Sequence, residues 1–360
     1  MGDFIFANLI FNYTGNDADG QSIATASLIN QSPILEKPND YYGFISRLVV
    51  SGFNTPLLIP QIVTNQSNPN LTVYNVALYY NGIYSDPISV IYVPPSNNLQ
   101  VPSSVGQYQD VSTNYYYIYN YNALCSMFNT AFSTALDNLN GKITTGTGTP
   151  PMLYYDPTYG IVLKVPVADY GQDTYSPDLP NDTVQIFINS SSAPFFNGQN
   201  LSLLKNSTGC YWRILLYPMV ANLSSDGSYY ISTPQNLQET NNIPSIQKYQ
   251  VITNMPIVQE YTAVPQSIAT PAIPYDQTSI LTDLAPDNSN PVSYGTEQIY
   301  NQVSSLRLFD ITGSKDLYQL SATINWTDQF GRTYPLLLGY GVQASIKFGF
   351  IKKSVYKGGR

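Results

Sequence analysis

Alternation of apolar and polar residues marks the last part of the chain. Between residues 321 and 327, Ala322, Ile324 and Trp326 fall on one side, and serine, threonine and asparagine fall on the other. After a Gly-containing link, the same alternation resumes between residues 342 and 350. A period of two is typical of strands that are buried on one face. The stretch therefore predicts strands that supply packing and few groups capable of chemistry.

Strand-like runs of the same kind recur elsewhere, separated by turn clusters rich in Asn, Pro and Ser. Several carry large side chains on both faces, which indicates strands that are covered from both sides. Neither end of the chain has enough strands for two sheets, so we expect segments near 41–95 to pair with segments near 249–351. The runs are residues 41–53, 71–82, 88–94, 211–219, 249–263 and 304–313.

A helical pattern interrupts the strands in the middle of the chain. Thr113 or Asn114 is expected to cap its start, and Gly141 follows its end. The pattern predicts a helix over residues 114–139. Apolar residues at spacings of three and four form one face of this helix, namely Ile118, Tyr121, Cys125, Phe128, Phe132, Ala135 and Leu139.

A linker, GKITTGTGTPP, follows the helix and leads into a hairpin over residues 152–166. The middle of the chain therefore has α+β character between two blocks of sheet, which an insertion into one loop of a β-sandwich explains most simply. We expect residues 1–110 and 246–360 to form the two parts of the sandwich. Residues 111–245 are expected to form the inserted lobe, with the helix packed on a small sheet that includes the hairpin.

Composition narrows the range of functions. Of the 360 residues, 43% are hydrophobic and only 11% are charged, and the chain contains 32 Tyr, 26 Pro and no His. Low charge suits a protein whose surfaces meet many neighbours. The lack of His removes His-based acid–base catalysis, Ser–His and Cys–His nucleophile pairs and most transition-metal sites. We therefore expect no enzyme and assign no catalytic, cofactor-binding or metal-binding residue.

Two groups of carboxylates are candidate sites. Asp17 and Asp19, followed by Gly20, resemble part of a calcium loop, but the EF-hand spacing and the terminal Glu are missing, so a plain turn is favoured. Asp310 and Asp328 could form the carboxylate pair of a glycosidase, although nothing in the sequence marks them as one.

Cysteines and tyrosines leave two further alternatives open. Cys125 and Cys210 could form one disulfide, but two buried thiols are the favoured interpretation. The Tyr-rich segments 77–86 and 114–121 could stack on sugars or bases, but packing between sheets or subunits is favoured at this density of Tyr in strands.

Charge is distributed unevenly along the chain. The formal net charge is −8, yet no acidic residue follows residue 346. A basic tail on an acidic body can bind a polyanion by counterion release, and a solvated tail that ends the last strand is the equally weighted alternative. The cations of this tail are Lys347, Lys352, Lys353, Lys357 and Arg360.

The N-terminal run MGDFIFANLIF is apolar but short. It lacks a basic n-region and a cleavage site, so no signal peptide is predicted. No apolar run approaches the roughly 20 residues that span a bilayer, so no membrane-spanning segment is expected.

Four segments, in this order along the chain, resemble the penton (minor capsid) proteins of virophages and polinton-like DNA viruses. They are YNVALYYNGIYSDPISVIYVP, YYYIYNYNALCSMFNTAFSTAL, PPMLYYDPTYGIVL and LRLFDITGSKDLYQLSATINWTDQFGRTYPLLLGYGVQASIKFGF. The last is the most recognisable, because it contains a W-x-D-x-F-G core at Trp326, Asp328, Phe330 and Gly331. The resemblance covers residues 41–351 and is one of pattern and order, without a catalytic signature.

This resemblance implies an all-β protein: a single jelly-roll β-sandwich with an inserted α+β lobe. It implies a structural protein of the virion that forms the pentameric vertex of an icosahedral DNA virus. The implied partners are a homopentamer, the major capsid protein of the same virus, a host receptor, and the genome through the five basic tail residues. We also expect the lobe to project outward and the tail to face the capsid interior. The alternatives are a viral fibre or surface adhesin that binds glycans through Tyr-rich loops, and a β-sandwich hydrolase.

Overall fold

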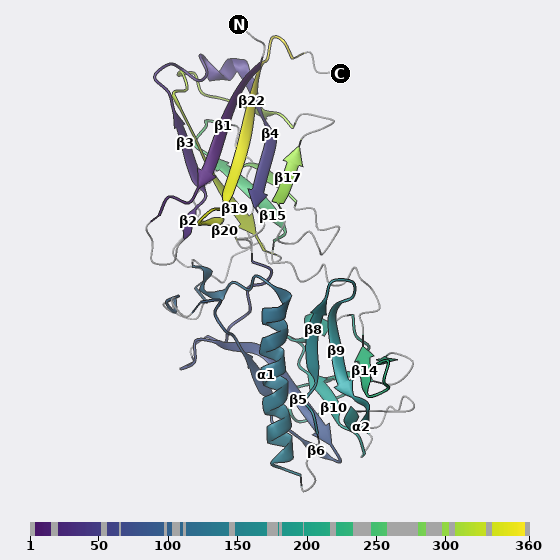
Figure 1. Cartoon of the computed structure of the whole chain (residues 1–360). Coiled ribbons are helices and arrows are strands. Elements are labelled where there is room, and N and C mark those ends of the chain that lie inside the picture. Colours follow the sequence, from purple (N-terminus) through teal and green to yellow (C-terminus); the bar gives the residue numbers. More distant parts are fainter. Residues whose placement is uncertain are drawn as a thin grey trace. The chain divides into compact units, whose positions relative to one another are not determined.

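The fold of the chain was obtained as a computed structural model (Figure 1). One compact unit, unit 1, comprises Met1–Thr55, Asp110–Asn114 and Ser245–Arg360, and the other, unit 2, comprises Pro56–Gln109 and Tyr115–Pro244. The structure describes all residues except 1–3, 16–20, 52–55, 65, 97–98, 103–108, 111–112, 144–147, 171–178, 180–181, 197, 217–220, 233–245, 258–279, 286–296, 302–306, 329–332 and 357–360.

Unit 1 has eight strands of five or more described residues, arranged in two antiparallel sheets. Numbered one to eight in chain order, they follow the order 1-8-3-6 in one sheet and 2-7-4-5 in the other. This is the strand order of a jelly roll. The first sheet contains β1 (Phe4–Asn12), β22 (Gln343–Lys352), β4 (Tyr41–Ser51) and β17 (Glu297–Asn301), and the second contains β3 (Thr25–Ile29), β19 (Gln319–Thr327), β15 (Lys248–Thr253) and β16 (Ile280–Leu284).

Shorter elements complete unit 1. The short strand β18 extends the first sheet by pairing with β4, and β20 extends the second by pairing with β19. A separate two-stranded sheet joins β2 to β21. These elements are β2 (Gln21–Ile23), β18 (Phe309–Asp310), β20 (Thr333–Pro335), β21 (Leu337–Gly339) and a 3-10 helix at Pro38–Asp40.

Both ends of the chain contribute to each sheet of unit 1. β22 lies between β1 and β4, and its pairing with β1 runs from Phe4 opposite Ile351 to Asn12 opposite Gln343. In the second sheet, β3 pairs with β19. The alternation expected in β22 is present, because Ala344, Ile346, Phe348 and Phe350 are all buried. The jelly roll therefore closes only when the C-terminal strands have joined the N-terminal ones.

The domain boundary expected at residue 110 is wrong. β5 (Leu71–Tyr80) pairs with β10 (Gln185–Ile188), so that Leu78 lies opposite Ile186. Segment 56–109 therefore belongs to unit 2, and the first segment of unit 1 ends at Thr55. The expected pairing between the segments near 41–95 and those near 249–351 is confirmed for β4 and contradicted for β5.

Trp326 lies in the core of the jelly roll. Its side chain is 1% exposed, and its ring stacks on the ring of Tyr334, with 4.4 Å between centroids. Tyr334 lies opposite Trp326 in the β19–β20 pair and donates its hydroxyl hydrogen to Asp328 Oδ2 at 2.9 Å. The first half of the W-x-D-x-F-G core thus closes a hairpin, whereas Phe330 and Gly331 lie outside the described residues.

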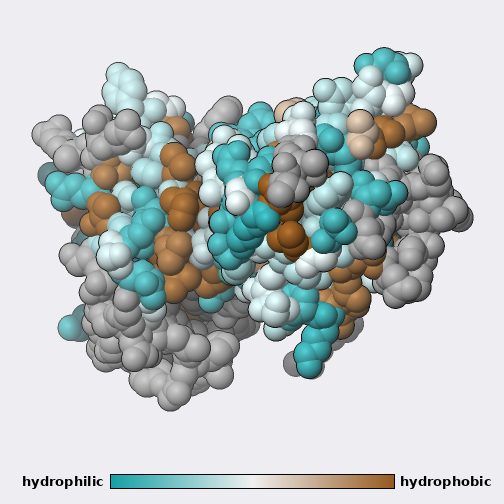
Figure 2. Space-filling model, turned by 90° about the horizontal axis from the view of Figure 1, so that it is seen from below, coloured by the Kyte–Doolittle hydropathy of each residue, from teal (hydrophilic) through white to brown (hydrophobic). Residues whose placement is uncertain are grey.

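Apolar side chains also remain on the surface. Phe6 and Ile10 of β1, Ile29 of β3 and Tyr340 in the turn before β22 are between 51% and 90% exposed. Figure 2 shows one side of the molecule, on which groups of hydrophobic residues alternate with hydrophilic ones. The surface therefore offers contact area with little charge, as the composition led us to expect.

Unit 2 has two antiparallel sheets and one long helix. The larger sheet has the order β11-β12-β10-β5-β6, with β7 also paired to β5, and the smaller sheet has the order β13-β14-β9-β8. The elements not yet bounded are β6 (Ile83–Tyr84), β7 (Ile88–Ile91), a 3-10 helix at Asn114–Tyr116, α1 (Tyr121–Asn140), β8 (Met152–Asp156), β9 (Gly160–Pro166), α2 (Val167–Tyr170), a 3-10 helix at Ala193–Phe196, β11 (Leu201–Leu203), β12 (Trp212–Ile214), β13 (Asn222–Leu223) and β14 (Tyr229–Ser232).

Helix α1 packs against strands of both sheets, with β8 from one and β5 and β7 from the other (Figure 1). All seven residues of the predicted apolar face are buried. The β8–β9 hairpin beside the helix was also predicted correctly. Within the part of the chain that the structure describes, no helix is long and apolar enough to cross a membrane.

The start of this helix was predicted too early. The backbone N–H of Ile118 donates to the carbonyl of Leu58 at 2.9 Å, and the carbonyl of Ile118 accepts from Leu57 at 2.7 Å. These bonds hold Ile118 in an isolated β-bridge, so the helix begins only at Tyr121. Asn120 is the cap, since its side chain accepts from the backbone N–H of Ala123 at 2.8 Å. The assignment of Thr113 or Asn114 as the cap is therefore wrong.

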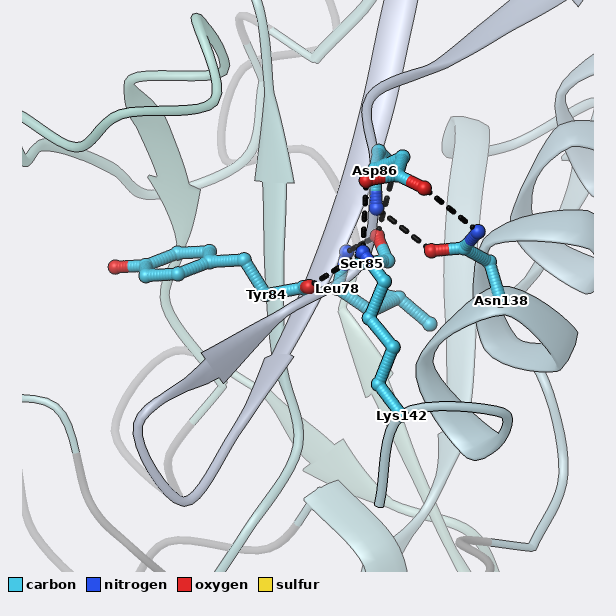
Figure 3. Close-up of polar contacts among 6 residues, drawn as sticks. All are labelled: Leu78, Tyr84, Ser85, Asp86, Asn138 and Lys142. Carbon is cyan, nitrogen blue, oxygen red and sulfur yellow. Dashed lines mark hydrogen bonds and ion pairs between the residues drawn. The ribbon is translucent and has the colours of Figure 1, made fainter.

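A polar cluster fastens the end of α1 to the segment between β6 and β7 (Figure 3). The Asp86 carboxylate accepts from Lys142 Nζ at 2.7 Å and from Asn138 Nδ2 at 2.9 Å, and its backbone N–H donates to Asn138 Oδ1 at 2.7 Å. Lys142 also donates to the carbonyl of Tyr84 at 3.2 Å. These hydrogen bonds, that of Lys142 first, lower the pKa of Asp86.

The burial of Trp326 leads to a first prediction. Trp326→Ala should lower the free energy of unfolding by roughly 3–5 kcal/mol, because it removes a fully buried ring and leaves a cavity. Denaturant unfolding followed by circular dichroism measures this loss. The control is Tyr340→Ala, since Tyr340 is 90% exposed. Equal stability of the two variants would mean that Trp326 is not a core residue in solution.

The Asp86 cluster leads to a second prediction, which concerns pH. A carboxyl whose pKa is lowered by folding stabilises the fold above its unfolded pKa and loses this effect as the pH falls through its folded pKa. The unfolding temperature of wild type should therefore exceed that of Asp86→Asn near neutral pH, and the gap should shrink below about pH 4. Thermal unfolding of both proteins across this pH range measures the gap. A gap that stayed constant with pH would show that the ion pair does not cause it.

Candidate assembly surface

The two candidate glycosidase carboxylates, Asp310 and Asp328, have separate structural roles. Asp310 accepts from Lys353 Nζ at 2.9 Å in the first sheet of unit 1, and Asp328 is buried beside Tyr334 in the second. Asp17 and Asp19 lie outside the described residues. Among the residues that the structure describes, no group of three or more His, Cys, Asp or Glu could hold a metal ion.

Both cysteines are buried free thiols, as the favoured interpretation held. Cys125 lies on α1, and Cys210 packs in a cluster with Ala77, Tyr79 and Phe187. Burial raises the pKa of each thiol to about 12. Neither thiol is therefore activated as a nucleophile.

The Tyr-rich segments serve mainly as packing. Tyr115, Tyr116, Tyr117 and Tyr121 are at most 7% exposed. The ring of Tyr121 stacks on Tyr155 with 4.3 Å between centroids. Burial raises the pKa of Tyr117 and Tyr121 above its ordinary value. Their burial leaves few open ring faces in segment 114–121 for a sugar or a base.

The basic tail lies partly against the first sheet of unit 1. Lys353 pairs with Asp310, lies 5.1 Å from the centroid of the Tyr42 ring, and donates its backbone N–H to the carbonyl of Asp40. Tyr356 meets Tyr42 edge to face. Lys352 is exposed at the end of β22. The charge of Lys353 is therefore already compensated within the chain, and Lys357 and Arg360 lie outside the described residues.

Lys347 lies farther along the same side of the β1-β22-β4-β17 sheet, the side that points away from the core. We call it the outer sheet face. Residues opposite one another in the register of these strands form three successive rows across it. The rows differ in chemistry, and each is described below.

An aromatic row crosses the outer sheet face at Phe6, Gly349 and Phe44. The ring of Phe44 lies directly over Gly349, since a Cβ at that position would come within 2.2 Å of the Phe44 ring. Phe6 meets Phe44 edge to face at 6.4 Å and is itself 51% exposed. Gly349 thus makes room for an aromatic layer on the side of the sheet away from the core.

A cationic row follows it, in which Lys347 lies directly opposite Arg47, flanked by Asn8 and Asn301. The Nζ of Lys347 lies 4.7 Å from the centroid of the Phe6 ring. Within the described part of the chain, no carboxylate forms an ion pair with either cation. Like charges directly opposite one another destabilise a sheet, so this row costs the isolated chain some stability.

An aliphatic row comes next, with Ile10, Ser345, Val49 and Ile299. Ile10 and Ile299 belong to the two outermost strands and are 55% and 56% exposed. The cationic row is therefore bordered by exposed apolar side chains on both sides. This is the arrangement of a protein interface, in which apolar and aromatic groups surround a few polar contacts.

The other sheet of unit 1 presents a different outer side. Its central strand β19 exposes Gln319 and turns Ser321, Thr323 and Asn325 in the same direction. The hydroxyl groups of Thr25 and Thr323 lie 3.1 Å apart across the β3–β19 pair. The two sheets thus offer chemically distinct surfaces, one aromatic and cationic and the other rich in hydroxyl and amide groups.

Among the residues of the three rows, the sequence analysis singled out only Lys347, and it did so as a cation of the basic tail. Arg47 was missed because a single charge within an apolar run carries no sign of its cross-strand partner. Phe6 and Ile10 were missed because the N-terminal run was considered only as a targeting signal. Their alternation with the buried residues Ala7 and Leu9 would have revealed an exposed apolar face.

Comparisons with known proteins agree with this fold. A family model described as Sputnik minor capsid protein V18/19 matches residues 5–352. Uncharacterized protein V18 of Sputnik virophage is 30% identical over 146 residues, which cover 39% of this chain and 87% of that protein.

Two solved structures are similar over nearly the whole chain. A chain in the 3.5 Å cryo-EM structure of the Sputnik virophage has a TM-score of 0.80 and 25% identity, with 99% of this chain and 100% of that chain covered. The crystal structure of the mavirus penton protein has a TM-score of 0.61 and 13% identity, with 97% and 99% covered, which indicates a shared fold. Since the family model spans nearly all of the jelly roll and unit 2, this chain belongs to the Sputnik minor capsid protein V18/19 family and is a minor capsid protein of a virophage-type virion.

Proposed function

We propose that five copies of this chain form the vertex of an icosahedral virophage capsid. The observation that supports this most is the single jelly roll with unit 2 inserted between β4 and β15, an architecture that matches the mavirus penton protein over 97% of this chain. A closed ring around a fivefold axis needs only one jelly roll from each copy. The role is then structural rather than catalytic, as membership of a capsid protein family supports.

The proposed partners follow from this role. Besides four further copies of the chain, the vertex would contact the major capsid protein of the same virus. We propose that the end of the basic tail faces the interior and contacts the genome through Lys352, Lys357 and Arg360, whereas Lys347 lies within β22 on the outer sheet face. Lys353 contributes less than expected because Asp310 already neutralises it.

Unit 2 is proposed to project outward and to contact a host receptor or an external fibre. Its support is topological. In the described part of unit 1, the strands before residue 52 pair with strands after residue 247, and the remaining pairs join two strands of that C-terminal part. Unit 2 is therefore not needed to complete either jelly-roll sheet. The adhesin hypothesis loses support because five of the eight tyrosines in the two Tyr-rich segments are buried and none of the eight is exposed.

The vertex proposal predicts the symmetry of the purified protein. Native mass spectrometry should detect an assembly of five 39.9 kDa chains, and averaged electron micrographs should show fivefold rings. Ring formation should rise with protein concentration, as for any reversible association. A trimer or monomer that binds glycans would instead support the adhesin alternative.

A fourth prediction concerns unit 2. Replacing residues 56–244 by a short Gly/Ser linker should leave a cooperatively unfolding jelly roll that still assembles into pentamers, because both sheets of unit 1 keep all their strands. Particles containing this variant should be less infectious than wild type. Native mass spectrometry and an infectivity assay measure the two effects. Loss of pentamers in a folded variant would place unit 2 in the subunit interface.

A further inference from the structure

We propose that the outer sheet face of one copy is the surface that contacts the next copy in the ring, with Arg47 and Lys347 together binding a carboxylate of that neighbour. This inference rests on the proposed pentamer and goes beyond it by naming the surface and the chemistry that joins the copies. The occupant is a second copy of this chain, not the genome and not another capsid protein.

Symmetry requires two different surfaces on each copy. In a closed ring with more than two members, each copy contacts its neighbour through heterologous surfaces, so that one surface of a copy meets another surface of the next. The jelly roll has two sheets, and their outer sides differ in chemistry in the way that such an interface needs. The outer sheet face supplies the apolar contact area, and a polar surface of the neighbour would supply the complement.

The exposed apolar groups are placed at both edges of this face. Phe6 and Ile10 extend from β1 at one edge, and Ile299 extends from β17 at the other. A sheet side that only meets solvent typically alternates to polar residues. The strands β1, β22, β4 and β17 have 9, 10, 11 and 5 residues. At about 4.8 Å between strands and about 3.4 Å per residue, they span roughly 600 Å². This approaches the roughly 800 Å² that each partner buries in a standard interface.

The cation pair gives the surface its specificity. Arg47 and Lys347 lie side by side in register on this face. Glu297 lies opposite Ser51, two rows away from Arg47. Two rows correspond to roughly 13 Å, too far for an ion pair. Asp310 lies opposite Tyr42, beyond the aromatic row, and is already paired with Lys353. A carboxylate arriving from outside would relieve the repulsion between the two cations and accept the bidentate fork of Arg47.

Charge favours a second copy over nucleic acid as the source of the anion. The chain carries a formal net charge of −8, so its copies offer carboxylates and repel a polyanion on average. The apolar rows on both sides of the cations would stay exposed against a phosphate backbone, whereas a protein surface can cover them. The flanking Phe6 and Ile10 thus select a protein partner.

The test pairs a charge-removing variant with a matched control. Arg47→Gln with Lys347→Gln removes the proposed anion site, and Lys37→Gln with Lys315→Gln removes two exposed cations of unit 1 from outside the outer sheet face. Both variants are compared with wild type by native mass spectrometry over a range of concentrations and salt. Thermal unfolding is measured on the same samples at a concentration below that of ring formation.

We expect the first variant to need on the order of tenfold more protein for half-assembly, and to lose most of the salt dependence seen in wild type. Its unfolding temperature should equal or exceed that of wild type, because the repulsion between Arg47 and Lys347 is gone. The control should assemble like wild type. A merely structural role for the two cations would instead lower the unfolding temperature and leave assembly unchanged.

A second measurement identifies the neighbour directly. Rings are formed from equal amounts of unlabelled and ¹⁵N-labelled chain and treated with a carbodiimide, which joins a Lys amine to an adjacent carboxylate. Mass spectrometry should find mixed-label crosslinks between Lys347 and an Asp or Glu.

Rings that form normally but give no such crosslink overturn this inference and leave the vertex proposal standing. A wild-type chain that stays monomeric overturns both, and ready assembly of the first variant combined with loss of its DNA binding would assign the cations to the genome.

Discussion

The insertion of β22 between β1 and β4 is the constraint on which the rest of this fold depends. It joins residues near position 8 to residues near position 347, and those in turn to residues near position 47. The ladder is long, and both neighbours present buried apolar side chains on the core side, so a slip of one residue would turn every one of them to the opposite face. Register is therefore fixed by burial. The same register decides which side chains meet on the outer side of the sheet, including Arg47 and Lys347.

Because the jelly roll is closed by its two ends, its middle is free to accommodate an insertion. Apart from the short segment Asp110–Asn114, the chain leaves unit 1 after β4 and returns before β15, and these two strands belong to different sheets. Unit 2 is stabilised by the burial of the apolar face of α1 against strands of both sheets of unit 2. Side-chain amides complete this packing. Asn129 donates to the carbonyl of Leu153 at 2.9 Å and accepts from its N–H at 2.6 Å, which satisfies the edge strand β8 as a further strand would.

Much of this architecture could be predicted from the sequence, and the errors have a common cause. Period-two alternation correctly identified β19 and β22, and the spacing of Phe128, Phe132 and Leu139 correctly identified α1. The errors concern segments whose neighbours are distant in sequence. β5 is apolar on both faces, which is equally suited to a jelly-roll strand and to the centre of another sheet, so the sequence could not decide its unit. Ile118 fits the helical spacing, but its β-bridge to Leu58 is a tertiary contact that no local pattern reveals.

The assembly surface was less predictable than the fold, because a capsid protein's chemistry lies in relations between strands. A catalytic site can often be recognised in a sequence by residue types such as His. Here the informative feature is an Arg and a Lys that the pairing of β4 with β22 places opposite one another. Each is ordinary alone. The inner side of the sheet is constrained by the core, and only the outer side can vary without unfolding the protein. Gly349 illustrates the link between the two sides, since the room it leaves lets the Phe44 ring pack flat on the outer side of the sheet while the core side stays packed. The outer side of the sheet can therefore change chemistry row by row while the register set by the core stays fixed.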